Sequence, residues 1–128
     1  MRSSDIMNSW LASLLMLTAL VGCAGCSSPH QLNKVVAADA LKRGLDAWQA
    51  GQTPETLRSG SPSVIFGDSD WENGVQLRQY RILNAERSDG TNLHADVELT
   101  LVTGKQKARK VTLTYIVGTE PQITIFRQ

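Results

Sequence analysis

The stretch from Leu93 to Thr103 constrains the fold most, because apolar and polar side chains alternate along it from Leu93 to Leu101. Its apolar positions are Leu93, Ala95, Val97, Leu99 and Leu101, and its polar positions are His94, Asp96, Glu98 and Thr100. Successive side chains of a strand point to opposite faces of a sheet, so this pattern predicts a strand with one buried and one solvated face. A fold of this chain must therefore place a second layer over one side of a sheet.

Other stretches predict the rest of that sheet. Strands are expected at residues 75–86, 111–117 and 123–125, with a short edge strand at residues 63–66. The alternation slips near Arg78-Gln79, which predicts a bulge that bends the strand. A turn at residues 104–107 brings two alternating strands side by side, and their apolar faces must stay together. The pairs expected from this turn are Leu101 with Val111, Leu99 with Leu113, and Val97 with Tyr115.

A helix is predicted at residues 33–50, ahead of the strands. Its apolar stripe consists of Ala38, Leu41, Leu45 and Trp48, widened by Val35, Ala37, Ala40, Gly44 and Ala47. These positions recur at three- and four-residue steps, which is the period of a helix with one buried face. Asn33 is suited to cap its first turn, Gly51 to end it, and Gly44 to let it approach the sheet closely. Thr-Pro-Glu at the start of residues 53–58 predicts a second, short helix there.

A long helix, a short helix and antiparallel strands, in this order, resemble the cystatin-like group, which includes the nuclear-transport-factor-like folds. The resemblance covers residues 33–128 and depends on the order of the elements. It implies an α+β fold in which the N-terminal helix packs on a bent antiparallel sheet of four to five strands. Cystatin inhibitors carry Gln-x-Val-x-Gly on a hairpin, and this string does not occur here, so no inhibitory residues are carried over.

The chain begins with a different kind of segment, an apolar run at residues 10–21 that follows Arg2. A basic start, an apolar stretch of roughly 7–15 residues and small residues after it are typical of a signal peptide, whereas a membrane span needs about 20 apolar residues. The run closes with Leu20-Val21-Gly22-Cys23, which resembles the lipobox of bacterial lipoproteins. We therefore expect a signal peptide at residues 1–22, a tether at residues 23–32 and a single domain at residues 33–128.

The lipobox resemblance implies that Cys23 becomes the mature N-terminus. Its thiol then carries a diacylglyceryl group and its amine often a further fatty acid such as palmitate, and two or more chains give stable membrane anchoring. Ala24 follows, where Asp is the usual signal for retention in the inner membrane, so the outer membrane is favoured. The alternative is an ordinary secretory signal cut near Gly22 or Gly25, which leaves a free protein. If Cys23 is lipidated, Cys26 is a leftover thiol on the tether.

The charge balance excludes several classes of partner. The whole chain carries a formal net charge of +1, and Arg2 and Asp5 of the predicted signal peptide cancel each other. This balance gives no electrostatic case for nucleic acid or for a polybasic patch that binds lipid. The chain contains no phosphate-binding glycine loop, dinucleotide fingerprint or serine-nucleophile motif, so we expect no cofactor and no enzymatic activity.

An acidic stretch, Asp68-Ser-Asp70-Trp-Glu72-Asn73-Gly74, resembles the start of a calcium loop, because oxygen ligands occupy its first, third and fifth positions. Asn73 stands where such a loop needs Gly, and Gln79 stands where it needs Glu. We therefore expect no metal site but an acidic turn that leads into a strand, with Trp71 packed on the edge of the sheet.

Two further groups of side chains are candidate ligand-binding residues. The polar group consists of His94, Asp96 and Glu98, and the aromatic group consists of Trp48, Trp71 and Tyr80. The polar group shares one strand face, where it suits proton transfer or part of a metal site. We expect, however, that these side chains belong to the solvated face of a half-exposed sheet. The aromatic group suits a ligand pocket, although we expect Trp48 and Tyr80 in the core.

These features predict a small lipid-anchored protein on the periplasmic side of a bacterial cell envelope, with a non-catalytic binding or assembly role. The alternative is a small-molecule-binding domain or minor enzyme with a pocket inside the bent sheet, which uses His94, Asp96 or Glu98. The expected partners are the membrane and a second envelope protein. For an assembly role, the final strand at residues 122–127 is expected to offer a free edge to that protein.

Overall fold

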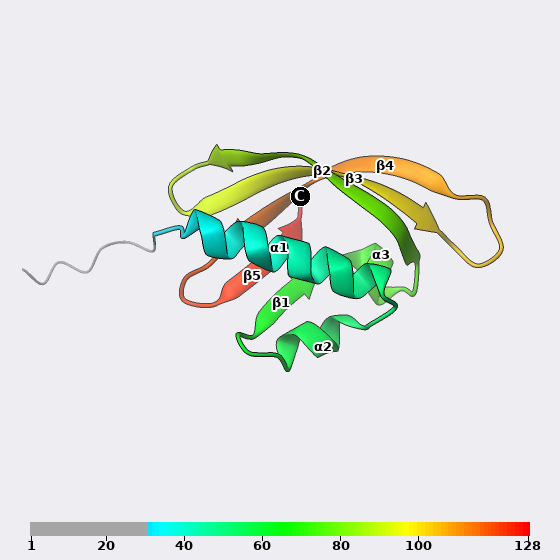
Figure 1. Cartoon of the computed structure of the whole chain (residues 1–128), viewed down its shortest axis with the longest axis horizontal. Helices are drawn as coiled ribbons and strands as arrows, with labels where there is room; N and C mark the ends of the chain where they lie inside the picture. Colours follow the sequence, from blue (N-terminus) through cyan, green and yellow to red (C-terminus); the bar gives the residue numbers. More distant parts are fainter. Residues whose placement is uncertain (1–30) are drawn as a thin grey trace, which may run out of the picture.

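One long helix, α1 (Lys34–Gln49), lies across one face of a five-stranded sheet in the computed structural model of this chain (Figure 1). The structure describes residues 31–128, so the predicted signal peptide, Cys23 and Cys26 lie outside the described residues. The other elements are α2 (Pro54–Arg58), β1 (Val64–Gly67), α3 (Ser69–Glu72), β2 (Gln76–Ser88), β3 (Asn92–Val102), β4 (Arg109–Gly118) and β5 (Ile123–Arg127). The predicted α+β class, with a helix packed on a sheet, is confirmed.

The sheet is mixed, so the prediction of a wholly antiparallel sheet is wrong. Its strand order is β1-β5-β4-β3-β2; β1 runs parallel to β5, and all other neighbouring strands are antiparallel. Alternation along a strand shows which face is buried but not the direction of the strand beside it. The long connection from β1 through α3 carries the chain to the opposite edge, from which β2, β3, β4 and β5 return to β1.

The last strand lies inside the sheet. β5 pairs with β1 on one side and with β4 on the other. The expectation that residues 122–127 offer a free edge to a partner is therefore wrong, because the main-chain groups of this strand already bind two neighbours. Within the described part of the chain, the edges of the sheet are β1 and β2.

The hairpin of β3 and β4 has the predicted faces but not the predicted register. The observed pairs are Leu99 with Val111, Val97 with Leu113, and Ala95 with Tyr115. Each expected pair is wrong by two residues. A shift by two keeps every side chain on its own face, so the apolar faces coincide in both registers and the alternation alone does not choose between them.

α1 begins and ends close to the predicted positions. The side chain of Asn33 accepts a hydrogen bond from the backbone N–H of Val36 at 3.1 Å, and Gly51 adopts a φ of +83° just beyond the helix. The buried residues are Ala37, Ala40, Leu41, Gly44, Leu45, Ala47 and Trp48. Val35 and Ala38 belong to the predicted stripe but are exposed, because the side of the helix that faces the sheet is centred on the buried residues and not on these two positions.

The predicted close approach at Gly44 is confirmed. A Cβ atom at this position would lie 2.4 Å from Cδ2 of Phe66, so only a glycine lets the helix pack directly on this ring. The predicted bulge near Arg78-Gln79 is also present, as a register shift between Leu77 and Gln79. Two further shifts follow toward the end of β2, and the strand curves over α1 (Figure 1). Within residues 31–128, no helix combines the length and the apolarity that a bilayer crossing requires.

Candidate functional site

A buried carboxylate, Asp68, lies directly after β1 and is 1% exposed. Its Oδ1 accepts the backbone N–H groups of Asp70 and Trp71 at 2.8 and 3.4 Å, which caps α3. Its Oδ2 accepts the hydroxyl of Tyr115 at 2.5 Å. A buried carboxylate is stable only when hydrogen bonds replace its lost hydration, and these three donors provide them.

Arg127 connects this buried carboxylate to the surface. Its Nη1 donates to Oδ2 of Asp70 at 2.6 Å and lies 3.5 Å from Oδ1 of Asp68. The hydrogen bond with Asp70 raises the pKa of Arg127 above its already high ordinary value. Tyr115 and Arg127 are opposite each other in the β4–β5 pair. The four side chains therefore join the β1–α3 corner to β4 and β5, and we call them the Asp68 cluster.

The proton of Tyr115 is held firmly in the Asp68 cluster. Burial raises the pKa of Tyr115 far above its ordinary value, and the charge of Asp68 and the hydrogen bond to it raise the pKa further. Tyr115 consequently stays neutral and remains a donor. The arrangement positions a carboxylate and retains a proton, which is the behaviour of a structural group.

The resemblance to a calcium loop does not extend to the geometry. Residues 69–72 form the short helix α3, and the carboxylates of Asp68 and Asp70 turn toward Tyr115 and Arg127. Trp71 was expected to pack on the edge of the sheet, and its buried ring lies edge-on to Phe66 of the edge strand β1, with ring centroids 5.1 Å apart. Among residues 31–128, no three His, Cys, Asp or Glu side chains are grouped closely enough to hold a metal ion.

The polar candidates of β3 lie on the open face of the sheet, away from α1, and each binds a different neighbour. The pairs are His94 Nε2 with Asp89 Oδ2 at 3.1 Å, Asp96 Oδ1 with Arg87 Nη2 at 2.7 Å, and Glu98 Oε2 with Arg81 Nη2 at 3.7 Å. Asp96 also accepts the hydroxyl of Thr114 at 2.7 Å. The sheet therefore spreads the three residues over separate contacts and does not converge them on one point, as the solvated-face prediction implies.

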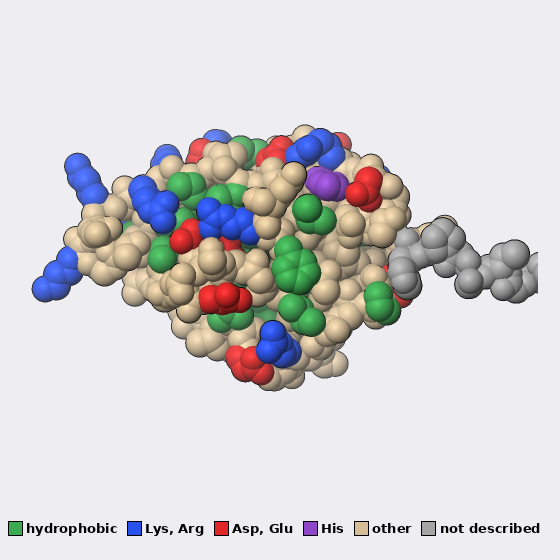
Figure 2. Space-filling view, turned by 180° about the vertical axis from the view of Figure 1, so that it is seen from behind, with side chains coloured by type: hydrophobic (Ala, Val, Ile, Leu, Met, Phe, Trp, Pro, Cys, Tyr) green, Lys and Arg blue, Asp and Glu red, His purple; other side chains and the backbone are tan. Residues whose placement is uncertain are grey.

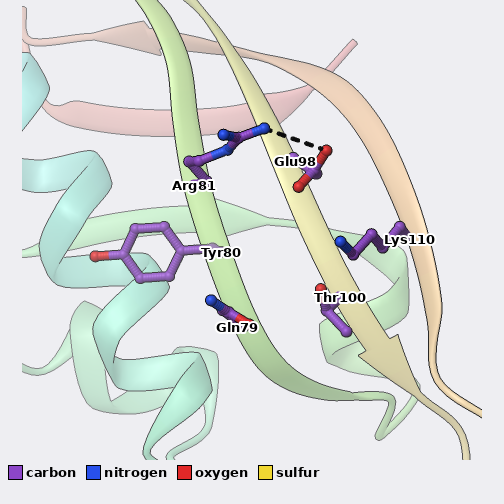
Figure 3. A pocket seen from close by; sticks show the side chains of 6 residues that line it. All are labelled: Gln79, Tyr80, Arg81, Glu98, Thr100 and Lys110. Carbon is purple, nitrogen blue, oxygen red and sulfur yellow. Dashed lines mark ion pairs between the residues drawn. The ribbon is translucent and has the colours of Figure 1, made fainter.

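A shallow hollow of about 260 Å³ lies beside Glu98. It is lined by Gln79, Tyr80, Arg81, Glu98, Thr100 and Lys110. Arg81 and Glu98 point toward each other in it, whereas Tyr80 points toward α1 (Figure 3). The hydroxyl of Tyr80 donates to Asp46 at 2.6 Å, and burial together with this carboxylate raises the pKa of Tyr80 to about 12. Tyr80 is thus partly buried and packs against the core, whereas the prediction placed it within the core.

The aromatic candidates Trp48 and Trp71 stack on each other, with ring centroids 5.5 Å apart. Both are buried, and their indole N–H groups donate to the backbone oxygens of Val75 and Gln52 at 2.8 and 2.9 Å. A wider hollow of about 580 Å³ reaches these rings between the α1–α2 and α3–β2 connections. Both rings line this hollow but are only 3% and 5% exposed, so the prediction that Trp48 belongs to the core is confirmed.

The open face of the sheet carries a group of apolar side chains at its centre, which the alternation of the strands did not predict. Figure 2 shows apolar side chains gathered in the middle of this face, with charged side chains around them. Ile116 pairs with His94 on one side and with Phe126 on the other, and Phe126 lies beside Gly67. Phe126 is 48% exposed. Gly67 leaves room for the ring in its present position, because a Cβ there would lie 2.8 Å from Cδ1 of Phe126.

Comparisons with protein-family models, with curated proteins and with solved structures found no match for this chain. Its function must therefore be argued from its own residues.

The sequence contained one usable signal for the Asp68 cluster. Tyr115 falls on the apolar face of its predicted strand, and a buried tyrosine hydroxyl needs a partner. The identity of that partner depends on β1 and β5 lying side by side, which brings Asp68 and Arg127 together. Neither alternation nor motif spacing contains that information.

Proposed function

We propose that this protein is a bacterial envelope lipoprotein, anchored in a membrane through lipid on Cys23, with a non-catalytic binding or assembly role. The observation that carries the proposal is the lipobox-like Leu20-Val21-Gly22-Cys23 at the end of a short apolar run. The run is too short for a permanent span, so fatty chains on Cys23 replace a helix as the anchor. Ala24 after the cysteine supports the outer membrane as the destination.

The start of the domain is compatible with this anchor. The backbone N–H of Leu32 donates to the backbone oxygen of Gly90 at 3.2 Å, and that of Asn33 donates to the hydroxyl of Thr119 at 3.1 Å. Cys23 lies nine residues before Leu32, which spans at most about 30 Å when fully extended. A lipid on Cys23 would thus hold this end of the domain close to the membrane.

A binding role fits the candidate chemistry better than catalysis. The groups that suit proton transfer, His94, Asp96 and Glu98, each bind a different neighbour on an open face. A general acid or base must reach the proton that it transfers together with the other reacting groups. Three separately paired side chains on a solvated sheet do not provide that geometry.

We also infer that the domain belongs to the cystatin-like fold type. A long N-terminal helix across a curved sheet, with four consecutive antiparallel strands, supports this assignment. The parallel strand β1 is an addition to the pattern, placed at the edge beside β5.

Metabolic labelling with a fatty acid tests the anchor in the cells that make the protein. We expect label on the wild-type protein, none on a Cys23→Ser variant, and full label on a Cys26→Ser variant, which is the matched control. Separation of the two membranes by density then shows which one holds the labelled protein. Label that survives the Cys23→Ser change contradicts the proposal.

A further inference from the structure

Two apolar side chains of α1 point away from the sheet, although their spacing placed them in the predicted buried stripe. Val35 is 78% exposed and Ala38 is exposed as well. Three residues apart, they share one side of the helix. Together with Lys34, Asp39 and Lys42 they line a shallow hollow of about 420 Å³. We call these five residues the anchor-side surface.

The anchor-side surface lies on the N-terminal half of α1, where the chain enters the domain. Leu32, just before the helix, is bound to Gly90 in the β2–β3 turn, so this turn and the start of α1 lie at the same end of the molecule (Figure 1). The connection between β3 and β4, which contains Lys107, lies at the other end of β3. The eleven residues of β3 separate the two ends by about 35 Å at roughly 3.3 Å per residue.

We propose that the anchor-side surface rests on the phospholipid bilayer that holds the lipid of Cys23. Val35 and Ala38 would enter the boundary between headgroups and acyl chains. Lys34 and Lys42 would lay their aliphatic stems along that boundary and place their ammonium groups at the headgroup phosphates. This inference rests on the proposed lipid anchor, and it adds a fixed orientation, with the β3–β4 connection directed away from the membrane.

Chain length and the combination of apolar side chains with lysine stems both favour the bilayer as the occupant of this surface. The short chain from Cys23 leads directly to this end of the domain, so a lipid-bearing cysteine keeps Val35 within about 45 Å of the membrane at all times, counting twelve residues at full extension. An apolar centre with lysines beside it matches a phospholipid surface, which offers hydrocarbon below and phosphate above. Asp39 opposes this attraction, so the apolar contact and not the net charge carries the proposal.

Fluorescence quenching in vesicles tests the orientation on the full lipidated protein. A fluorophore is attached at a Val35→Cys change in a Cys26→Ser background, and a Lys107→Cys change in the same background serves as the matched control. The vesicles contain phosphatidylethanolamine, phosphatidylglycerol and a fraction of lipid that carries a spin label near the headgroup. We expect several-fold stronger quenching by the spin-labelled lipid at position 35 than at position 107.

Two results would overturn the proposal. Equal quenching at both positions would mean that the domain tumbles freely on its tether. A fluorophore at position 35 that is shielded from aqueous iodide but not quenched by the spin-labelled lipid would mean that residues of the chain itself cover the surface. A second label at Ala38→Cys tests whether the dye itself drives insertion. If Val35 holds the surface on the bilayer, adding a Val35→Asp change must abolish the quenching of this label by the spin-labelled lipid.

Intact-mass analysis of the same samples separates this inference from the proposed function. A protein without added lipid mass contradicts the anchor itself. A lipidated protein with equal quenching at the two positions leaves the anchor in place and removes only the orientation.

Discussion

The two faces of the sheet use similar carboxylate contacts with different consequences. On the covered face, Asp68 accepts a tyrosine hydroxyl and lies near Arg127; on the open face, Asp96 accepts the hydroxyl of Thr114 and binds Arg87. The side chain of Asp68 is 0% exposed and that of Asp96 is 31% exposed. Water screens and replaces contacts on the open face but not on the covered one. The comparison teaches that burial, more than the type of contact, sets the energetic weight of these groups.

The largest difference between the faces is expected from removing each carboxylate. Asp68→Ala leaves the buried hydroxyl of Tyr115 without its acceptor and uncaps α3, while Arg127 keeps its hydrogen bond with Asp70. We therefore expect a loss of about 2–4 kcal/mol in the free energy of unfolding. Asp96→Ala breaks contacts at a solvated site and should cost less than about 1 kcal/mol. Urea denaturation with unchanged m-values measures both. Equal losses in the two variants would show that burial is not the deciding factor.

A finer test removes one hydroxyl on each face from adjacent residues. Tyr115→Phe deletes the donor to Asp68, and because a hydrogen bond to a buried charged group contributes about 1.5–3 kcal/mol, we expect a loss of about 2 kcal/mol. Thr114→Val deletes the corresponding donor to Asp96 at nearly constant volume. Water can replace that donor, so we expect a loss of less than about 1 kcal/mol. The same urea titrations decide, and a costlier Thr114→Val change would reverse the comparison.

Much of the fold can be predicted from periodicity in the sequence, and the wrong predictions concern features that periodicity does not determine. The cap at Asn33, the close approach at Gly44 and the strands on either side of the β3–β4 turn each have a local cause. The register of that hairpin does not, because a shift of two residues leaves every face unchanged. The position of β5 inside the sheet depends on β1, which is 56 or more residues earlier in the chain.

Two glycines provide a packing test of the same comparison. Gly44 makes room for the buried ring of Phe66, and Gly67 makes room for the half-exposed ring of Phe126. Gly44→Ala forces a Cβ into a closed core at a cost of about 1–3 kcal/mol, which the better helix propensity of Ala offsets by about 1 kcal/mol. We expect a net loss of about 1 kcal/mol, measured by urea denaturation.

The control for this packing test is Gly67→Ala. The ring of Phe126 can turn into solvent there, so the cost should be smaller than at Gly44. The cost of Gly44→Ala should be smaller in a Phe66→Leu background than in the wild type, because the smaller side chain relieves the contact with the new methyl group. A Gly44→Ala variant as stable as the wild type would mean that the helix shifts to accommodate the new methyl group.

The candidate sites were harder to predict than the fold. The alternation along β3 correctly placed His94, Asp96 and Glu98 on a polar face, but their partners come from a bulged neighbouring strand and a turn. Asp68 appeared in a motif of exposed oxygen ligands and is instead buried, because β4 and β5 bring Tyr115 and Arg127 over it. Such convergence depends on the tertiary arrangement, which spacing along the chain does not contain.

The smallest effect is expected from a carboxylate at the rim of the open face. The backbone N–H of Asn92, the ring of His94 and the backbone N–H of Thr91 bind Asp89 and lower its pKa from 3.8 to about 2. In the unfolded chain Asp89 takes up its proton near its ordinary pKa, whereas in the folded protein it stays ionised down to about pH 2, so the folded state binds fewer protons in this interval. The contribution of Asp89 to the free energy of unfolding is therefore complete above about pH 4 and is lost as the pH falls toward 2.

An Asp89→Asn variant tests that pH dependence. It removes the titrating group while keeping an oxygen that can accept the backbone N–H groups of the turn. We expect the free energy of unfolding to fall less steeply between pH 4 and pH 2 in the variant than in the wild type, as measured by urea denaturation at each pH. About half of the side-chain surface of Asp89 is open to solvent, so added salt should shrink the difference. Identical pH profiles would show that the contacts of Asp89 are too exposed to influence stability, which would extend the contrast with Asp68 to its limit.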